Sequence, residues 1–485
     1  MSSYAFTKLK SGVSAFEAVL STVKSFPNVK SIIVLGDNTL EESEAYKAIR
    51  KDRWNIESLI SELSRIGKSY DHLFYVFGDC YFLDAGITAD MYETHKNYFA
   101  EYTFADGFPE GLSPEIIRTS ILPSIQRLSE GNTDSVTRDS MFDVIQKDIN
   151  AFDVETEISP RDLRHLRIFL TADSKRNVML LERLIDKGIS GKGDLLKILD
   201  TERQLLRTLP AYFPIQVVES CPQACTYCPY PKWNPNLLTA DGKMDMERFY
   251  DIIERISSFC EDAVIGLSLW GEPAMHPQIA EIAAAVKRTN GLSLLLETSG
   301  IGWSHDTIDA VNENADDSVN WIISLDALDA ELYKTLRGEG REKAHNTAKY
   351  LLERVPGNTY VQAVRMNENE FDLENFYRNW KKVTDHVIIQ KFDHFCGFLP
   401  ERKVTDLSPL ERAECWHLKR DMPILMDGTV PMCSEVYTGT ERLGNVFSHS
   451  LEEIWNKGYE YYIRHVSREY PDICKRCDEY YTYNF

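Results

Sequence analysis

Residues 215–228 read IQVVESCPQACTYC, an apolar strand-like run that leads directly into three cysteines. These cysteines, Cys221, Cys225 and Cys228, lie within eight residues, so one short loop lets their sulfurs converge on one face of a metal cluster. A [4Fe–4S] cluster normally takes four cysteine ligands, and three would leave one iron open to bind another molecule. A structural zinc site with a distant fourth ligand is the alternative that this spacing also allows.

The same run opens a series of strand patterns that alternate with amphipathic helical patterns. Strands are predicted at 215–220, 263–270, 292–299, 320–327, 359–366 and 386–392. Six strand–helix units in about 180 residues indicate parallel strands joined by right-handed crossovers. We therefore expect an α/β protein whose central domain is a partial barrel or an open sheet.

The patterns on either side of this series divide the chain into four expected segments. Residues 1–150 alternate strand and helix patterns and predict a first α/β domain. Residues 151–210 are polar and helical, and we expect them to form a connector. Residues 211–395 hold the strand–helix series, and residues 396–485 form a turn-rich tail that carries five of the ten cysteines.

The composition argues against several classes of function. The 485 residues include 75 acidic and 54 basic ones, which gives a formal net charge of −21. Nucleic acids and anionic lipids both require a basic face, so neither is an expected partner. No apolar run approaches the length of a membrane span, and the N-terminus lacks the apolar core of a secretory signal. We therefore expect a cytoplasmic protein whose cysteines bind metal rather than form disulfides.

The cysteine spacing, with an aromatic residue before the third cysteine, resembles the radical S-adenosylmethionine (SAM) superfamily. Three further matches follow at the ends of predicted strands, in the order that this family would place them. Residues 270–273 (WGEP) resemble the GGEP motif, with Trp270 in place of its first glycine. Residues 297–300 (ETSG) resemble the turn near the SAM ribose, and residues 324–326 (SLD) resemble the polar position on the ribose or carboxylate. The carboxyl ends of strands are where α/β barrels build their sites.

This resemblance implies a partial (β/α)6 TIM-like barrel and an enzyme. Three cysteines would hold a [4Fe–4S] cluster, SAM would chelate its open iron, and one electron would cleave SAM to a 5′-deoxyadenosyl radical that abstracts hydrogen from the substrate. The implied cofactor contacts are Gly271, Glu272, Pro273, Thr298, Ser299, Ser324 and Arg337, with Arg341 as the alternative to Arg337. The expected partners are SAM, an electron donor such as flavodoxin or ferredoxin, and a peptide, glycan or nucleotide-sugar type of substrate. No catalytic residue is assigned beyond the cluster.

A second cysteine group lies in the tail and consists of Cys415, Cys433, Cys474 and Cys477. The pattern of Gly428-x4-Cys433 and a late Cys-x-x-Cys resembles the SPASM/twitch extension of radical SAM enzymes. Four ligands imply one fully ligated auxiliary [4Fe–4S] cluster with an electron-transfer role, and a four-cysteine zinc ribbon is the alternative. Glu435 would lie near this cluster, although a surface salt bridge is the ordinary expectation for such a residue.

The remaining cysteines and two histidines carry weaker signals. Cys396 is either an alternative ligand or a buried free thiol, whereas Cys80 and Cys260 lie in apolar contexts that are typical of packing residues. His276 and His394 are expected to have structural roles rather than to face a cavity.

The N-terminal segment resembles cytidylyltransferase-like sugar nucleotidyltransferases. The residues that match by position are Asp79, which corresponds to that family's metal ligand, and Gly111, Leu112 and Glu115, which correspond to its sugar side. That family's glycine-rich loop with Arg and Lys has no counterpart in residues 1–45, and without it nucleotidyl transfer lacks charge stabilisation. We therefore expect a degenerate domain for recognition or scaffolding.

Taken together, these segments make nearly the whole chain similar to the spiro-SPASM family. Two other classes of function remain as alternatives. One is an active sugar nucleotidyltransferase with an iron–sulfur appendage, and the other is a non-catalytic iron–sulfur scaffold or electron carrier.

Overall fold

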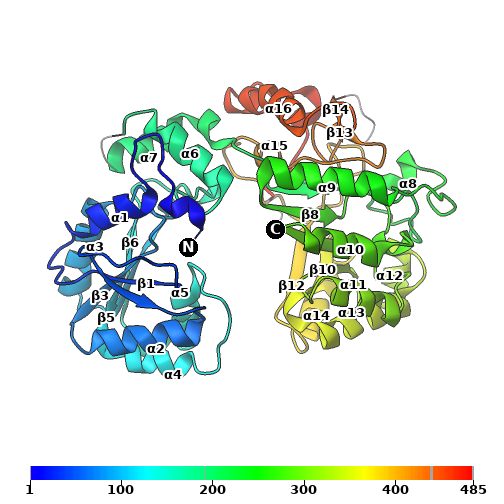
Figure 1. Ribbon diagram of the computed structural model, residues 1–485. Helices are drawn as coiled ribbons and strands as arrows, with labels where there is room; N and C mark the ends of the chain where they lie inside the picture. Colours follow the sequence, from blue (N-terminus) through cyan, green and yellow to red (C-terminus); the bar gives the residue numbers. More distant parts are fainter. Residues whose placement is uncertain (1, 190–191, 437–440, 483–485) are drawn as a thin grey trace. The chain divides into compact units, whose positions relative to one another are not determined.

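The structure, a computed structural model, describes residues 2–189, 192–436 and 441–482. The chain folds into two compact units, Met1–Leu206 and Arg207–Phe485, each with its own sheet (Figure 1). Within the described ranges, no helix combines the length and the apolar character that crossing a membrane requires.

The first unit is built on a four-stranded sheet with the order β3-β5-β4-β6. Strand β5 runs antiparallel to both of its neighbours, whereas β4 and β6 are parallel. The parallel pair β1-β2 forms a separate sheet. The elements are α1 (Ala15–Val23), β1 (Ile33–Gly36), β2 (Lys47–Arg50), α2 (Ile56–Gly67), β3 (His72–Tyr75), α3 (Ala85–Asn97), β4 (Tyr102–Asp106), β5 (Glu115–Arg118), α4 (Leu122–Leu128), α5 (Ser140–Gln146), β6 (Val154–Ile158), α6 (Lys175–Ile185) and α7 (Lys192–Thr201).

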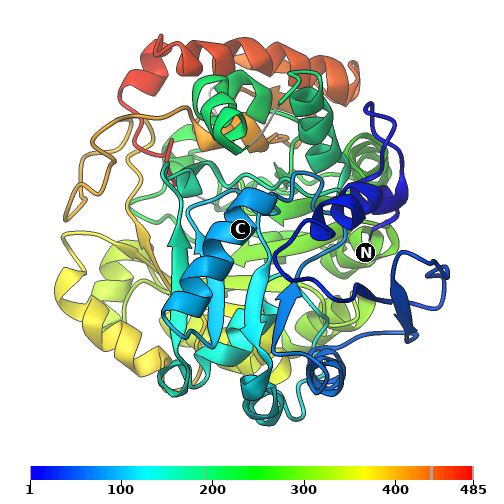
Figure 2. The ribbon, with the colours of Figure 1, turned by 90° about the vertical axis from the view of Figure 1, so that its left-hand side faces the viewer.

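Helices pack on both faces of this four-stranded sheet (Figure 2). The adjacent residues Ile116 and Ile117 of β5 are both fully buried, because side chains alternate between the faces of a strand and each face is covered. Ile116 belongs to a cluster with α3, α6 and α7, and Ile117 belongs to a cluster with α2, α4 and α5.

The segment that we expected to be a helical connector, residues 151–210, differs from that expectation. Its residues up to Leu206 belong to the first unit. Strand β6 forms an edge of the four-stranded sheet, and leucines at helical spacing on α6 and α7 are buried in the core of the unit. The apolar faces of the two helices explain this packing, because burying them is favourable.

The second unit contains a six-stranded sheet with the order β12-β11-β10-β9-β8-β7. All neighbouring strands are parallel and follow chain order, which confirms the expected partial (β/α)6 barrel. The elements of the barrel are β7 (Tyr212–Pro214), α8 (Tyr230–Trp233), α9 (Met246–Cys260), β8 (Ala263–Leu267), α10 (Ile279–Arg288), β9 (Leu292–Thr298), α11 (His305–Asn314), β10 (Asn320–Ser324), α12 (Ala330–Arg337), α13 (Arg341–Arg354), β11 (Thr359–Arg365), α14 (Glu370–Trp380) and β12 (Val387–Lys391).

The first strand of the barrel lies upstream of its expected position at 215–220. Strand β7 ends at Pro214, and residues 421–424 of the C-terminal region pair along its other edge. The N–H of Ile424 donates to Pro214 O at 2.8 Å, and the N–H of Gln216 donates to Ile424 O at 2.9 Å. This pairing joins the C-terminal region to the edge of the barrel.

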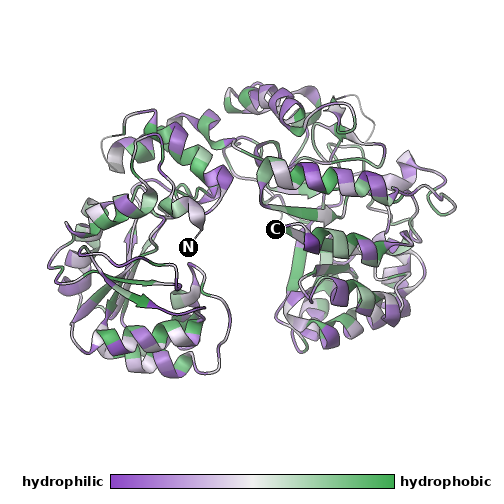
Figure 3. Cartoon of the chain, viewed as in Figure 1, coloured by the Kyte–Doolittle hydropathy of each residue, from purple (hydrophilic) through white to green (hydrophobic). Residues whose placement is uncertain are grey.

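The C-terminal region is small and mostly irregular. Its elements are α15 (Trp416–Arg420), the antiparallel pair β13 (Thr429–Pro431) and β14 (Arg442–Asn445), α16 (Leu451–Val466) and α17 (Asp472–Lys475). Helix α16 begins at a capping box between Ser450 and Glu453. In Figure 3 the amphipathic helices α2 and α9 carry both hydrophilic and hydrophobic colours, as expected for helices that bury one face.

Candidate active site

A cavity of about 370 Å³ lies at the carboxyl ends of the strands in the second unit. Its walls come both from the barrel and from the C-terminal region. The cysteines that line it are Cys221, Cys225, Cys228, Cys396, Cys415, Cys433, Cys474 and Cys477. The other two cysteines, Cys80 and Cys260, are buried in apolar surroundings, which agrees with the packing roles expected for them. The fold thus brings both predicted cysteine groups to one cavity.

The loop that carries the first cysteine group is held by the end of α12. The side-chain Nε2 of Gln223 donates to the hydroxyl of Tyr333 at 3.0 Å, and Gln223 Oε1 accepts from Nε of Arg337 at 3.1 Å. The backbone N–H of Thr226 donates to Leu336 O at 2.9 Å. These contacts fix a loop that has no regular secondary structure of its own.

The thiols of this loop would bind metal as thiolates. Burial raises the pKa of Cys221 to about 12 and also raises the pKa of Cys225 and Cys228, so bound metal is needed to keep them as thiolates. A tetrahedral zinc site has Zn–S bonds of about 2.3 Å, which places its sulfurs about 3.8 Å apart. Among the residues that the structure describes, neither cysteine group brings three ligand atoms within 4.8 Å of one another. The sulfurs of neither group are therefore gathered as closely as in a tetrahedral zinc site.

The predicted GEP segment joins the ends of β8 and β9 through the carboxylate of Glu272. Its Oε1 accepts from the hydroxyl of Thr298 at 2.6 Å, and its Oε2 accepts from the N–H and hydroxyl of Ser299 at 2.8 and 2.6 Å. Gly271 has a φ of +84°, and a Cβ there would lie 2.4 Å from Val218 O, so only glycine fits. Pro273 opens a short 3-10 turn. Gly271, Glu272, Thr298 and Ser299 line the cavity, whereas the predicted contact Pro273 does not.

Two other predicted cofactor residues are already engaged within the chain. Ser324 Oγ accepts from Gln362 Nε2 at 3.2 Å. The guanidinium of Arg337 pairs with Asp326 and contacts the hydroxyl of Tyr227, and all three groups are buried. Arg341 instead donates to the carbonyl of Leu328. Sequence reasoning did not find the network around Arg337, although the tyrosine before the third cysteine was a signal for one of its members.

The four predicted ligands of the second group come from four different parts of the C-terminal region. Cys415 caps α15, Cys433 follows β13, Cys474 lies in α17 and Cys477 follows that helix. Burial raises the pKa of Cys415, Cys433 and Cys474. As in the first group, metal binding would be needed to hold these buried sulfurs as thiolates.

Cys396 also lies in this group. The neighbouring thiol of Cys477 raises the pKa of Cys396, and both Phe395 and Cys396 have a positive φ, 50° and 55°. Non-glycine residues rarely adopt this conformation, so the loop is held in an unusual shape that turns Cys396 towards the cluster ligands. The structure therefore places five thiols around one site.

The acidic residues near this site are buried rather than exposed. The Oε2 of Glu435 is inaccessible, and burial, together with the neighbouring Asp393, raises the pKa of its carboxyl well above the usual range. The ordinary expectation of a surface salt bridge at Glu435 is therefore wrong. Both carboxyl groups line the cavity.

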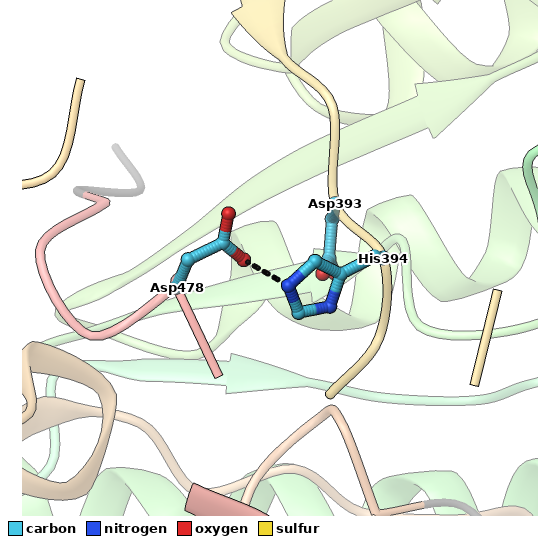
Figure 4. Close-up of side chains that lie close together, drawn as sticks. All are labelled: Asp393, His394 and Asp478. Atoms are coloured by element: carbon cyan, nitrogen blue, oxygen red, sulfur yellow. Dashed lines mark ion pairs between the residues drawn. The ribbon is translucent and has the colours of Figure 1, made fainter. Parts of the chain in front are cut away.

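Asp393, His394 and Asp478 bring one ligand atom each within 4.8 Å of one another (Figure 4). The ring Nε2 of His394 lies 3.4 Å from Asp478 Oδ1. However, Asp478 Oδ2 also lies 3.4 Å from Lys391 Nζ and 3.5 Å from Lys403 Nζ, so two ammonium groups of the chain already balance its charge. This cluster ties the loop of Cys396 to the neighbour of Cys477. His276 is likewise structural, since its Nε2 bonds to Met244 O at 2.9 Å.

In the first unit, the aspartate that matches a metal ligand faces an arginine. Asp79 Oδ2 accepts from Arg138 Nη2 at 2.7 Å, and the same nitrogen lies 3.1 Å from Asp173 Oδ2. Leu112 is fully buried, and burial raises the pKa of Glu115 to about 8. A Cβ on Gly111 would lie 2.9 Å from a backbone oxygen. Among the described residues of this unit, no three metal-ligating side chains converge.

Comparison with known proteins agrees with this geometry. Residues 215–379 match the model of the radical SAM superfamily, and residues 415–478 match the SPASM model of an iron–sulfur cluster-binding domain. An uncharacterised protein of Treponema pallidum (strain Nichols) is 38% identical over 358 residues, which cover 71% of this chain and 98% of that protein. A second uncharacterised protein of the same organism is 30% identical over 76 residues, 16% of this chain and 35% of that protein.

Several solved structures are also similar. BtrN in complex with AdoMet and 2-DOIA has a TM-score of 0.40 and 15% identity, covering 56% of this chain and 94% of BtrN. Native anSMEcpe with bound AdoMet has a TM-score of 0.42 and 14% identity, covering 56% of this chain and 88% of anSMEcpe. Streptococcus suis SuiB bound to S-adenosylmethionine has a TM-score of 0.41 and 14% identity, covering 57% of this chain and 74% of SuiB. From its two family models, the chain belongs to the radical SAM superfamily, whose enzymes use a [4Fe–4S] cluster and SAM, and it carries a SPASM iron–sulfur domain.

Proposed function

We propose that this enzyme removes hydrogen from an unactivated position of a peptide or of a glycan or nucleotide-sugar type of substrate. One auxiliary [4Fe–4S] cluster serves electron transfer. The observation that carries the proposal is the single cavity lined by both cysteine groups. A substrate held in this cavity lies within reach of both cluster sites.

In this proposal the two cysteine groups have different tasks. The ligands of the SAM-binding cluster are Cys221, Cys225 and Cys228, and those of the auxiliary cluster are Cys415, Cys433, Cys474 and Cys477. When bound, the first cluster and SAM supply a 5′-deoxyadenosyl radical that takes a hydrogen atom from the substrate. The second set has four ligands and no open iron, which favours electron transfer over substrate ligation.

The chain's own residues orient SAM and exclude water. Gly271 lines the cavity, and its backbone would receive the SAM amino group. Glu272 fixes Thr298 and Ser299 by accepting their hydrogen bonds, which positions the turn for the ribose. Ser324 and Arg337 complete the proposed contacts, with the charge of Arg337 shared with Asp326.

Two glutamines on the barrel wall of the cavity could bind a substrate that has amide or hydroxyl groups. Gln362 donates to Glu297 Oε1 at 3.0 Å from inside the barrel, and Gln390 lines the same wall. Side chains of this type bind both donors and acceptors. Peptides and carbohydrates present both, so the two substrate classes must be separated by assay.

The test is anaerobic reconstitution followed by an iron count and an assay for 5′-deoxyadenosine. Two clusters predict about eight irons per chain. Cys221→Ala should lose about half of the iron and all SAM cleavage, whereas Cys433→Ala should lose about half of the iron and keep cleavage. Cys260→Ala removes a buried thiol outside both groups and should change neither. Zinc in place of iron, or cleavage that survives Cys221→Ala, would contradict the proposal.

The two alternative functions give different results in the same preparations. A scaffold or electron carrier would bind no SAM after reduction. A nucleotidyltransferase would release pyrophosphate from CTP and a sugar phosphate.

A further inference from the structure

The side chains of Arg412, which is partly buried, and His465, which is buried, line the same cavity as Cys474 and have no role in the proposal above. Arg412 precedes the first ligand of the auxiliary site by three residues, and His465 lies near the end of α16. They reach the site from segments that are far apart in sequence.

Four of the five side-chain nitrogens of these two residues have no hydrogen-bond partner among the described residues. In the described part of the chain, Nε and Nη2 of Arg412 and both ring nitrogens of His465 are buried without one. His465 is only 2% exposed. Buried polar groups are normally hydrogen-bonded, and a buried cation is normally paired, so these groups require an acceptor that the polypeptide itself does not supply.

Aromatic rings fix the orientation of the guanidinium. Arg412 lies between Tyr470 and Tyr480, with its central carbon 4.3 Å from each ring centroid. Tyr470 also makes an edge contact with His465, at 4.9 Å between the ring centroids. Cation–π contact satisfies the faces of the guanidinium but leaves its N–H groups, which lie in its plane, free to donate.

The nearby cysteines indicate which acceptor is missing, namely the sulfurs of the proposed auxiliary cluster. Four thiolates around a [4Fe–4S] core carry net negative charge, and the cluster sulfurs accept N–H hydrogen bonds. Tyr470 and Tyr480, which hold Arg412, pack in the same buried cluster as Cys415 and Cys474. The guanidinium is therefore held close to two of the proposed ligands.

We infer that Arg412 and His465 form an N–H donor face for the sulfurs of the auxiliary cluster and raise its reduction potential. The inference rests on the proposed ligand set. Hydrogen bonds to sulfur and nearby positive charge both stabilise the reduced cluster, which carries one more electron. A higher potential makes the auxiliary cluster a better acceptor for an electron from the substrate.

The test is a redox titration of the auxiliary cluster, followed by EPR, in full-length protein whose three cysteines of the first group are replaced by alanine. Arg412→Gln should lower the potential so that the ratio of reduced to oxidised cluster falls about tenfold at fixed potential, which is about 59 mV for a one-electron couple. Arg412→Lys keeps the charge but loses the planar fork, and should shift the potential less in the same direction. His465→Phe should also lower it.

A matched control is Arg476→Gln, which removes the same charge from an exposed residue between Cys474 and Cys477. It should leave the potential near that of the parent protein, because solvent screens the charge. If Arg412→Gln loses its cluster, Arg412→Lys decides: a lower potential supports the inference and an unchanged one overturns it. An unchanged potential with full iron in Arg412→Gln overturns the inference as well. The same holds if the potential is unchanged and only the KM for substrate rises, because Arg412 would then bind a substrate anion. A parent protein with no auxiliary iron would instead contradict the proposed function.

Discussion

Nη1 of Arg337 lies 2.5 Å from Oδ2 of Asp326, and both side chains are buried. Arg337 also donates through Nε to Gln223, which lies inside the first cysteine loop. Asp326 Oδ1 accepts from the N–H of Val364 at 2.7 Å. One ion pair thus connects the end of α12, two strand ends and the cluster loop.

Arg337→Gln should therefore destabilise the second unit. Removing one partner leaves the carboxylate of Asp326 buried and unpaired, which typically costs about 3–5 kcal/mol. Urea unfolding under anaerobic conditions measures this loss. Arg378→Gln is the control, because its pair with Glu374 is exposed and is worth below about 1 kcal/mol. Equal losses in the two variants would contradict the role given to Arg337.

Glu272→Ala should weaken SAM binding without removing the cluster. The substitution leaves the buried donors of Thr298 and Ser299 without their acceptor, at about 1–3 kcal/mol for each group. We expect the Kd for SAM to rise by about tenfold or more, measured by equilibrium binding to the reconstituted protein. Glu281→Ala removes a hydrogen-bonded glutamate of α10 outside the cavity and should leave the Kd unchanged. Unchanged SAM affinity in Glu272→Ala would show that the turn is not part of the SAM site.

Cys396→Ala tests whether Cys396 is a cluster ligand or only a thiol that lies beside one. The four-cysteine set completes the ligation of one auxiliary cluster, so loss of the thiol that contacts Cys477 should leave about eight irons per chain. Cys474→Ala should lose about half of that iron. The opposite result, in which Cys396→Ala loses half of the iron and Cys474→Ala keeps all of it, would mean that Cys396 is a ligand in place of Cys474.

The features of the fold and of the site that could be predicted from the sequence are those that depend on short stretches of it. The strand pattern at 292–299 corresponds to β9 at Leu292–Thr298, because a buried parallel strand is a short apolar run. The cysteine groups were recognisable because ligand spacing is a short-range pattern. The first strand was misplaced, since β7 pairs with residues 421–424, about two hundred residues away, and such pairing leaves no local pattern. The stacking of Arg412 between Tyr470 and Tyr480 likewise depends on tertiary contacts that no local pattern encodes.

The first unit should show no nucleotidyltransferase activity. The carboxylate of Asp79 is buried against Arg138, so a guanidinium holds the position in which that family would bind a divalent metal. With CTP, a sugar phosphate and Mg²⁺, we expect no pyrophosphate above the background without enzyme, measured by a coupled phosphate assay. Pyrophosphate release that Asp79→Ala abolishes would establish the transferase instead.

The stability of the first unit should fall as pH rises from about 5 to 8 because of Glu115. Burial, reinforced by the charges of Glu110 and Asp139, raises the pKa of Glu115 from 4.5 to about 8. Between these values the folded protein holds a proton that the unfolded chain releases, so its contribution is full below pH 4.5 and is lost as pH rises through 8. Over this range the effect is on the order of 4 kcal/mol.

Glu115→Gln keeps a neutral side chain at every pH and should flatten this dependence, so that the variant exceeds the parent protein in stability at pH 9. Pulse proteolysis across a urea series, with mass identification of fragments from residues 1–206, reports the first unit separately. The matched control is Glu93→Gln on the exposed face of α3, which should reproduce the parent profile. Parallel pH profiles for Glu115→Gln and the parent protein would mean that Glu115 is ionised in the folded unit, and that its buried carboxylate has a partner in solution.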